Sequence, residues 1–181
     1  MTAECREYFL DKKDKILDDW FNHLILHYDD NKLDYLEKER DPFLNPVKYI
    51  FTSALESIFS YIFNDEKFEA IYQDIEKLIK LLALNGPKAS EVLGSFVFFK
   101  QHINALFLSN FSLEEKIDES NEITNAFDNL LLKIFDMYVQ CREKIYEIRV
   151  NEIKRMTFPL LERSGLIERM NVDKNKGLYD I

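Results

Sequence analysis

The chain has 181 residues, of which 46% are hydrophobic and 31% charged, and its formal net charge is −9. This composition is typical of one soluble globular domain and excludes a disordered chain. The negative charge argues against nucleic acid or an anionic membrane surface as partner, because both are bound through basic residues. Only four glycines occur, too few for a turn-rich β protein or a phosphate-binding loop.

The sequence carries no recognisable signal for export or membrane insertion. The N-terminal stretch MTAECREYFLDKK contains acidic residues and no apolar core segment, unlike a signal peptide. The apolar run around Phe96–Phe99 is far shorter than the ~18–20 residues of a membrane helix. Cys5 and Cys141 show no metal-binding or redox spacing, so we expect reduced thiols. These features predict a cytoplasmic protein.

The first predicted element is a helix from residue 3 to about residue 28, followed by a polar loop over 29–40. Its apolar residues recur at three- and four-residue steps. They are Phe9, Ile16, Leu17, Trp20, Phe21, Leu24 and Tyr28.

The stretch DPFLNPVKYIF, residues 41–51, marks the start of the second helix. Asp41 and Asn45 each precede a proline, which disfavours the helical conformation at both positions. Asn45 is a good N-cap, and Pro46 suits the first helical position, where its missing N–H needs no partner. The prolines therefore predict a rigid loop that ends in a helix start.

Two further helices are predicted over residues 65–84 and 88–110, separated by Gly86-Pro87. The second of them is apolar around most of its circumference, which is typical of a helix enclosed by its neighbours. We therefore expect residues 88–110 to form a buried central helix.

A long helix is predicted over residues 121–156, ended by Pro159 and followed by a short tail over 159–181. At ~1.5 Å per residue it extends about 54 Å, more than the width of a domain of this size. With no strand-like alternation anywhere, the fold class predicted is all-α, with residues 1–158 as one domain.

Residues with heptad spacing along the long helix predict a seam for a parallel dimer. From Val139 onwards charges dominate and the apolar stripe narrows, which favours a coiled-coil contact over a globular core. The alternative is that the helix folds back along its own bundle. The seam residues are Phe127, Leu131, Ile134, Tyr138, Cys141, Ile145 and Ile148.

Three stretches together resemble a known family: DPFLNPVKYIF (41–51), NGPKASEVLGSFVFFKQHI (85–103) and MYVQCREKIYEIRVNEIKR (137–155). They are similar to the N-terminal sensory domain of the RsbR-type stressosome proteins, the RsbT co-antagonists. The resemblance implies an all-helical, globin-related domain that usually lacks haem, dimerises and signals through its exiting helix. The positions that match the family pattern are Asp41, Pro42, Asn45, Pro46, Pro87, Ala89, Phe96, Lys100, Arg142 and Glu143.

The chain departs from this family in two respects. Lys88 follows Pro87 where family members often have another polar residue. Full-length family members also continue into a phosphorylatable output domain, whereas this sequence ends at Ile181. The resemblance therefore implies sensing, dimerisation and docking of a regulatory partner protein, without stressosome assembly.

The three histidines are candidates for ligands of a metal or a haem. His23 and His27 lie four residues apart on one helix face, but no third metal ligand accompanies them, and a solvated face is the simpler interpretation. His102 lies in the aromatic central helix, where a haem ligand is conceivable. The abundant Phe around His102 would fill a haem cavity, which favours a hydrogen-bonded histidine at the edge of the core.

Lys100 and Cys141 each have two interpretations. Lys100 on a buried helix predicts a carboxylate partner, for example Asp41; the alternative is a lysine that reaches the surface. In a parallel dimer the two copies of Cys141 would face each other and could form a disulfide, whereas free cysteines mostly pack as small apolar residues.

No set of nucleophile, base and orienting residue is present, so we expect no enzyme activity and no catalytic residues. The sequence predicts a regulatory domain whose exit helix responds to a partner protein or a small apolar ligand near Phe96, Phe99 and Ile103. A globin-type carrier of haem or another apolar ligand, with His102 as the haem ligand, is the alternative. A structural adaptor without a pocket is a third possibility.

Overall fold

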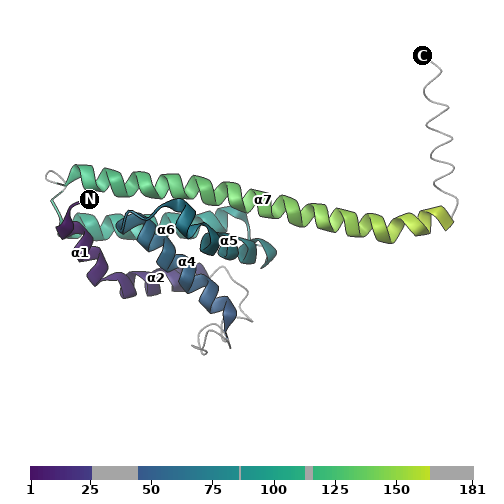
Figure 1. Cartoon of the computed structure of the whole chain (residues 1–181), viewed down its shortest axis with the longest axis horizontal. Coiled ribbons are helices and arrows are strands. Elements are labelled where there is room, and N and C mark those ends of the chain that lie inside the picture. Colours follow the sequence, from purple (N-terminus) through teal and green to yellow (C-terminus); the bar gives the residue numbers. More distant parts are fainter. Residues whose placement is uncertain (26–44, 86, 113–115, 164–181) are drawn as a thin grey trace, which may run out of the picture. The chain divides into compact units, whose positions relative to one another are not determined.

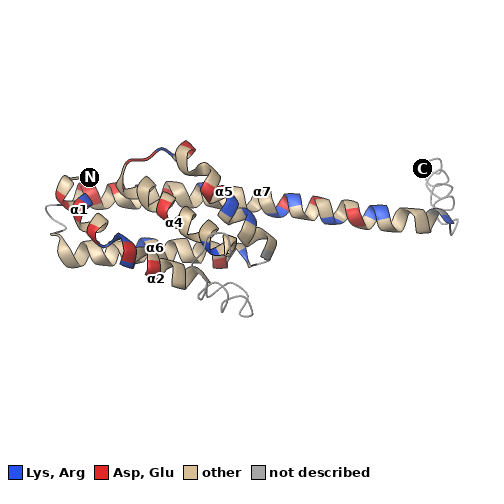
Figure 2. Ribbon diagram, turned by 60° about the horizontal axis from the view of Figure 1, so that its bottom comes forward, with Lys and Arg blue, Asp and Glu red and all other residues tan. Residues whose placement is uncertain are grey.

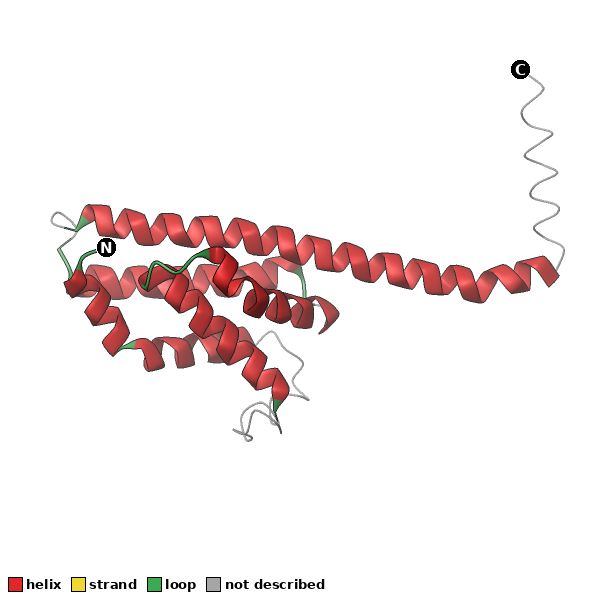
Figure 3. Cartoon of the chain, in the orientation of Figure 1, coloured by secondary structure: helices red, strands yellow, loops and turns green. Residues whose placement is uncertain are grey.

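The computed structural model describes residues 1–25, 45–85, 87–112 and 116–163, and every regular element in them is an α-helix. This confirms the all-α prediction (Figures 1 and 3). Asp41, Pro42 and His27 lie outside the described residues. The helices are α1 (Ala3–Asp11), α2 (Lys13–Ile25), α4 (Pro46–Phe63), α5 (Phe68–Asn85), α6 (Ala89–Asn110) and α7 (Ile117–Arg163).

The chain divides into two units, Met1–Cys141 and Arg142–Ile181. The first unit contains α1 to α6 and residues 117–141 of α7. The described part of the second unit is the later part of α7, residues 142–163. The domain boundary predicted near residue 158 does not coincide with this division.

The predicted first helix is two helices, α1 and α2, which meet at Lys12. The break allows the two pieces to pack on different neighbours. Phe9 of α1 stacks on Phe63 of α4 with ring centroids 4.5 Å apart. Trp20 of α2 stacks on Phe99 of α6 at 3.8 Å. One straight helix was therefore the wrong prediction for this segment.

The start of α4 confirms the predicted cap. Asn45 is 1% exposed, and its Oδ1 accepts a hydrogen bond of 2.9 Å from the backbone N–H of Lys48. Pro46 is the first residue of the helix. From this start, α4 packs along α5 and against α2. Its buried face consists of Phe51, Ala54, Leu55, Ile58, Phe59, Ile62 and Phe63.

Helix α6 begins at Ala89, close to the predicted position, and the side chain of Glu91 accepts a hydrogen bond from the backbone N–H of Lys88. Less of the surface of α6 is buried than predicted. Val97 is 37% exposed and Leu108 is 57% exposed. The helix therefore buries one face, made of Val92, Ser95, Phe96, Phe99, Ile103 and Phe107.

Helix α7 runs past Pro159 to Arg163, so the prediction that this proline ends the helix is wrong. A proline inside a helix removes the hydrogen bond to the carbonyl four residues earlier, here that of Arg155. Both Arg155 and Pro159 are exposed, so water can hydrate the freed carbonyl. The solvent-facing position makes the helix tolerant of this residue.

Candidate functional site

An aromatic cluster joins α2, α6 and α7 in the first unit. The indole of Trp20 lies parallel to the ring of Phe99, and its Nε1 donates a hydrogen bond of 3.1 Å to the carbonyl of Ser95. Phe127 of α7 meets the other side of the cluster, with its ring edge-on to Phe99 at 5.1 Å. Buried aromatic rings in these orientations stabilise one another beyond the area that they bury.

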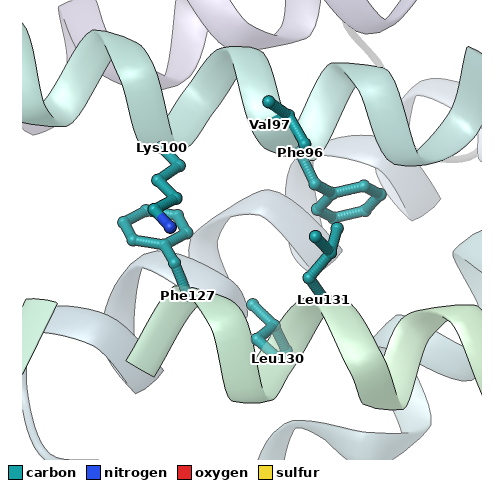
Figure 4. A pocket seen from close by; sticks show the side chains of 6 residues that line it. All are labelled: Phe96, Val97, Lys100, Phe127, Leu130 and Leu131. Carbon is teal, nitrogen blue, oxygen red and sulfur yellow. The ribbon is translucent and has the colours of Figure 1, made fainter. Parts of the chain in front are cut away.

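The residues predicted to line a ligand pocket are packed core residues. Phe96 is 3% exposed, and Phe99 and Ile103 are fully buried. A cavity between α6 and α7 borders Phe96, but its volume is about 10 Å³. Figure 4 shows its lining: Phe96, Val97, Lys100, Phe127, Leu130 and Leu131.

This cavity has room for about one water molecule. Pockets that hold drug-sized ligands or cofactors measure roughly 300–1,000 Å³. A small apolar ligand at Phe96, Phe99 and Ile103 would therefore require these rings to move. The pocket interpretation stays a prediction that the packing does not favour.

Lys100 has a carboxylate partner on α7, whereas Asp41, the partner suggested by the sequence, lies outside the described residues. The Nζ of Lys100 lies 2.6 Å from Oδ1 of Asp128 on α7. The lysine side chain is 24% exposed and that of Asp128 is 53% exposed. Lys100 thus passes the rim of the small cavity and carries its charge to the surface, which combines the two interpretations.

His102 lies at the edge of the core, where α6 faces α2. Its Nε2 is 3.7 Å from Oδ2 of Asp19. Phe98 stacks on His23 with centroids 3.7 Å apart, and the ring of His102 lies parallel to Phe98 at 6.2 Å. This setting is that of a boundary histidine beside a carboxylate, and Phe98 occupies the space next to its ring.

Pro87, one of the family-pattern positions, receives a hydrogen bond from helix α7. The hydroxyl of Tyr138 donates to the Pro87 carbonyl. Tyr138 is 3% exposed. The bond ties α7 to the segment that opens α6, and a proline has a carbonyl to offer but no competing N–H.

Three of the first four residues of the predicted dimer seam are buried within their own chain, and the fourth, Leu131, is half-buried. Phe127, Ile134 and Tyr138 are between 0% and 3% exposed. Phe127, Ile134 and Tyr138 belong to one face of α7 that packs within the first unit, together with Ile123, Leu130 and Met137. Their assignment to a contact between two copies was wrong, because the core of the chain already covers them.

The two cysteines are free thiols, and burial raises the pKa of both. Cys5 is fully buried. Cys141 is half-buried, and the charged groups nearest its thiol include Lys80 and Glu76 of α5. A raised pKa lowers the thiolate fraction and hence the reactivity. The packing role of Cys141 is better supported than a disulfide.

The later part of α7 exposes many large apolar side chains. Ile148 of the predicted seam is 50% exposed, and Ile145 is half-buried. Charged bands alternate along this segment in Figure 2. The other exposed apolar residues are Tyr146, Val150, Ile153, Met156, Phe158, Leu160 and Leu161.

Most of these exposed residues were missed at the level of sequence. Tyr146, Val150 and Ile153 follow the same four- and three-residue spacing as the predicted seam, but in another phase. The spacing was therefore a usable signal. The spacing of Tyr146, Val150 and Ile153 was overlooked because the predicted seam started at Phe127. Phe127 lies on the face of α7 that is buried in the core.

The part of the chain that the structure describes contains neither a metal-binding cluster nor a helix that could span a membrane. No group of three or more His, Cys, Asp or Glu side chains is arranged to hold a metal ion there. None of the described helices is long and apolar enough to cross a membrane.

Comparison with known proteins gives no match among protein-family models, curated proteins or solved structures. The resemblance to the RsbR-type sensory domain, and the relation to globins that it implies, stay predictions.

Proposed function

We propose that this protein is a non-enzymatic regulatory domain that self-associates through the later part of α7. The observation that carries the proposal is the exposure of that segment. Ile153 is 60% exposed, Leu160 is 62% exposed and Met156 is 73% exposed. An isolated helix is marginal in water, and its stability in proteins comes mainly from packing of an apolar face. A partner that covers this face would supply that packing.

The energetics support a reversible contact. Full burial of one aliphatic or aromatic side chain contributes about 1.5–3 kcal/mol, so completing the burial of a half-exposed one contributes roughly half of that. Five such side chains on each of two helices would contribute about 7–15 kcal/mol. Association costs an estimated 4–15 kcal/mol or more. The gain and the cost are of similar size, so the contact should form and separate as the protein concentration changes.

A regulatory role adds a signal to this association. On this proposal a partner protein or ligand that binds the first unit shifts the equilibrium of α7 between two packings. The link between α6 and α7 through Tyr138 and Pro87 is a physical route for that coupling. The similarity to the RsbR-type sensory domain points to the same kind of role, in the cytoplasm. The packing around Phe99 gives no comparable support to a haem or ligand carrier.

Light scattering on the full chain during a dilution series tests the self-association. We expect a mass near twice the monomer value of 21.6 kDa at high micromolar concentration, falling towards the monomer on dilution. A monomer mass throughout the series would refute the proposal. Absorption spectroscopy of the same sample provides an independent check for a bound haem.

A further inference from the structure

Apolar side chains on the later part of α7 form a single stripe along the helix. An α-helix turns about 100° per residue, so Tyr146, Val150, Ile153 and Leu160 lie within roughly 40° of one line. They are 54%, 47%, 60% and 62% exposed. Thr157 completes the four- and three-residue alternation, which is the spacing of a coiled-coil seam. We call these five residues the α7 stripe.

The stripe and the seam predicted from the sequence lie on different faces of this segment. Ile148 is 50% exposed, as exposed as the members of the stripe, but it points away from them. Its own face continues with Glu152 and Arg155, which are charged. The predicted seam therefore ends at Ile148, whereas the α7 stripe continues for four helical turns.

Charged residues flank the α7 stripe at both edges. One edge carries Glu147 and, two turns further on, Lys154, and the other carries Arg142 and Arg149. Arg142 and Glu147 also make contacts within their own helix. Arg142 donates a hydrogen bond of 3.0 Å to the hydroxyl of Tyr146, and Lys144 lies 3.5 Å from Glu147 with both side chains largely exposed. Exposed pairs of this kind contribute little and are easily exchanged.

We propose that the α7 stripe binds the same stripe of a second copy of this chain, in a parallel and in-register coiled coil. The inference rests on the proposed self-association and specifies its surface and geometry. In a parallel pair each edge faces the opposite edge of the other helix, so Arg142 faces Glu147 of the partner subunit, twice by symmetry. Tyr146, Val150 and Ile153 then form successive apolar layers.

The apolar layers, rather than the charges, favour this arrangement over an antiparallel one. Antiparallel coiled coils set alternate seam positions against each other, so Leu160 would face Glu143 of the partner subunit, whereas in the parallel pair each stripe residue faces its own copy. In the parallel pair the contact of Arg149 with Lys154 of the partner subunit is unfavourable and also occurs twice, so it offsets the contact of Arg142 with Glu147 of the partner subunit. Further along, Met156 faces Leu161 of the partner subunit, which adds apolar burial at the far end of the stripe.

Two matched variants test which face is used. Ile153→Glu places a charge in the stripe, and Ile148→Glu places the same charge on the opposite face at similar exposure. Because an unpaired charge is costly to bury, we expect Ile153→Glu to raise the dimer Kd at least about 100-fold. Ile148→Glu should change it by less than about threefold. Circular dichroism of both variants would verify that they are folded.

The outcomes separate this inference from the proposed function. If Ile148→Glu dissociates the dimer and Ile153→Glu does not, self-association stands and the α7 stripe is the wrong surface. If the unmodified chain is monomeric, both proposals fail.

A charge exchange tests the orientation. Arg142→Glu and Glu147→Arg should each weaken the dimer by about tenfold, and the double variant should restore it, because the pair between subunits is re-formed with its signs reversed. Weakening that adds up in the double variant would overturn the parallel arrangement.

Discussion

Replacing Phe99 by alanine is the most direct test of the aromatic cluster. The Phe99 side chain is fully buried, parallel to Trp20 at 3.8 Å and edge-on to Phe127 at 5.1 Å. Truncation of a buried Phe costs about 3–5 kcal/mol, and two aromatic contacts are lost with it. We therefore expect Phe99→Ala to reduce the free energy of unfolding by about 4–5 kcal/mol. In a chain of this size that corresponds to a fall in Tm of roughly 8–20 °C.

Urea unfolding followed by circular dichroism and by tryptophan fluorescence measures this loss. Trp20 is the only tryptophan in the chain, so its emission reports directly on the cluster. The matched control is Phe135→Ala, because Phe135 is 43% exposed and its truncation should cost about 1 kcal/mol or less. If the two variants lose the same free energy of unfolding, the packing around Phe99 is not as described.

Three smaller effects follow from individual contacts. In thermal melts, Lys100→Met should change the free energy of unfolding by less than about 1 kcal/mol. The reason is that the pair with Asp128 is partly exposed and methionine packs well on the cavity rim. A larger loss of unfolding free energy would contradict this assignment of Lys100. Burial raises the pKa of the Cys5 thiol from 9.0 to about 11, so the folded state keeps a proton that the unfolded chain releases. The contribution of Cys5 to stability should therefore be complete below pH 9.0 and be lost between pH 9.0 and about 11 in urea titrations. Cys5→Ala should show a smaller decline, because the raised pKa of Cys141 contributes a decline of the same sign. Asn45→Ala should cost about 1 kcal/mol of unfolding free energy, whereas Asn45→Ser, which keeps a capping oxygen for Lys48 without burying a charge, should cost clearly less.

The sequence predicted the helices well where local chemistry decides. Asn45 and Pro46 mark the start of α4 because capping and the fixed φ of proline act within one turn. The separation of α5 from α6 likewise coincides with a Gly-Pro pair. The break at Lys12 was not predictable in this way. It depends on the packing of α1 and α2 against different helices, which are distant in the sequence.

The candidate site was harder to predict because it depends on what covers each face. Apolar spacing shows that a helix has a buried face, but not whether its own chain or another copy buries it. Phe127 and Tyr138 were assigned to a dimer contact and are part of the core. The partner of Lys100 was similarly beyond the sequence, since Asp128 comes near it only when α6 and α7 pack side by side.

Helix α7 carries apolar residues on two different faces, and this allows the regulatory proposal to be tested separately from dimerisation. The set through Ile134 and Tyr138 is buried in the first unit, while the α7 stripe is exposed in the second. If a signal in the first unit reaches the stripe, a mild change at the buried set must alter the dimer Kd. Tyr138→Phe removes the hydrogen bond to the Pro87 carbonyl at a cost of about 1 kcal/mol, without touching the stripe.

Coupling of the usual size, about 1–3 kcal/mol, would shift the dimer Kd of Tyr138→Phe by about fivefold or more in sedimentation equilibrium. The same chemical change at Tyr72, which is 41% exposed on α5, should leave the Kd unchanged. A Tyr138→Phe variant that dimerises like the unmodified chain would mean that the two sets act independently. In that case α7 would join two copies of the chain without carrying a signal. A dimer Kd that does not change with the conformation of the first unit cannot transmit that conformation.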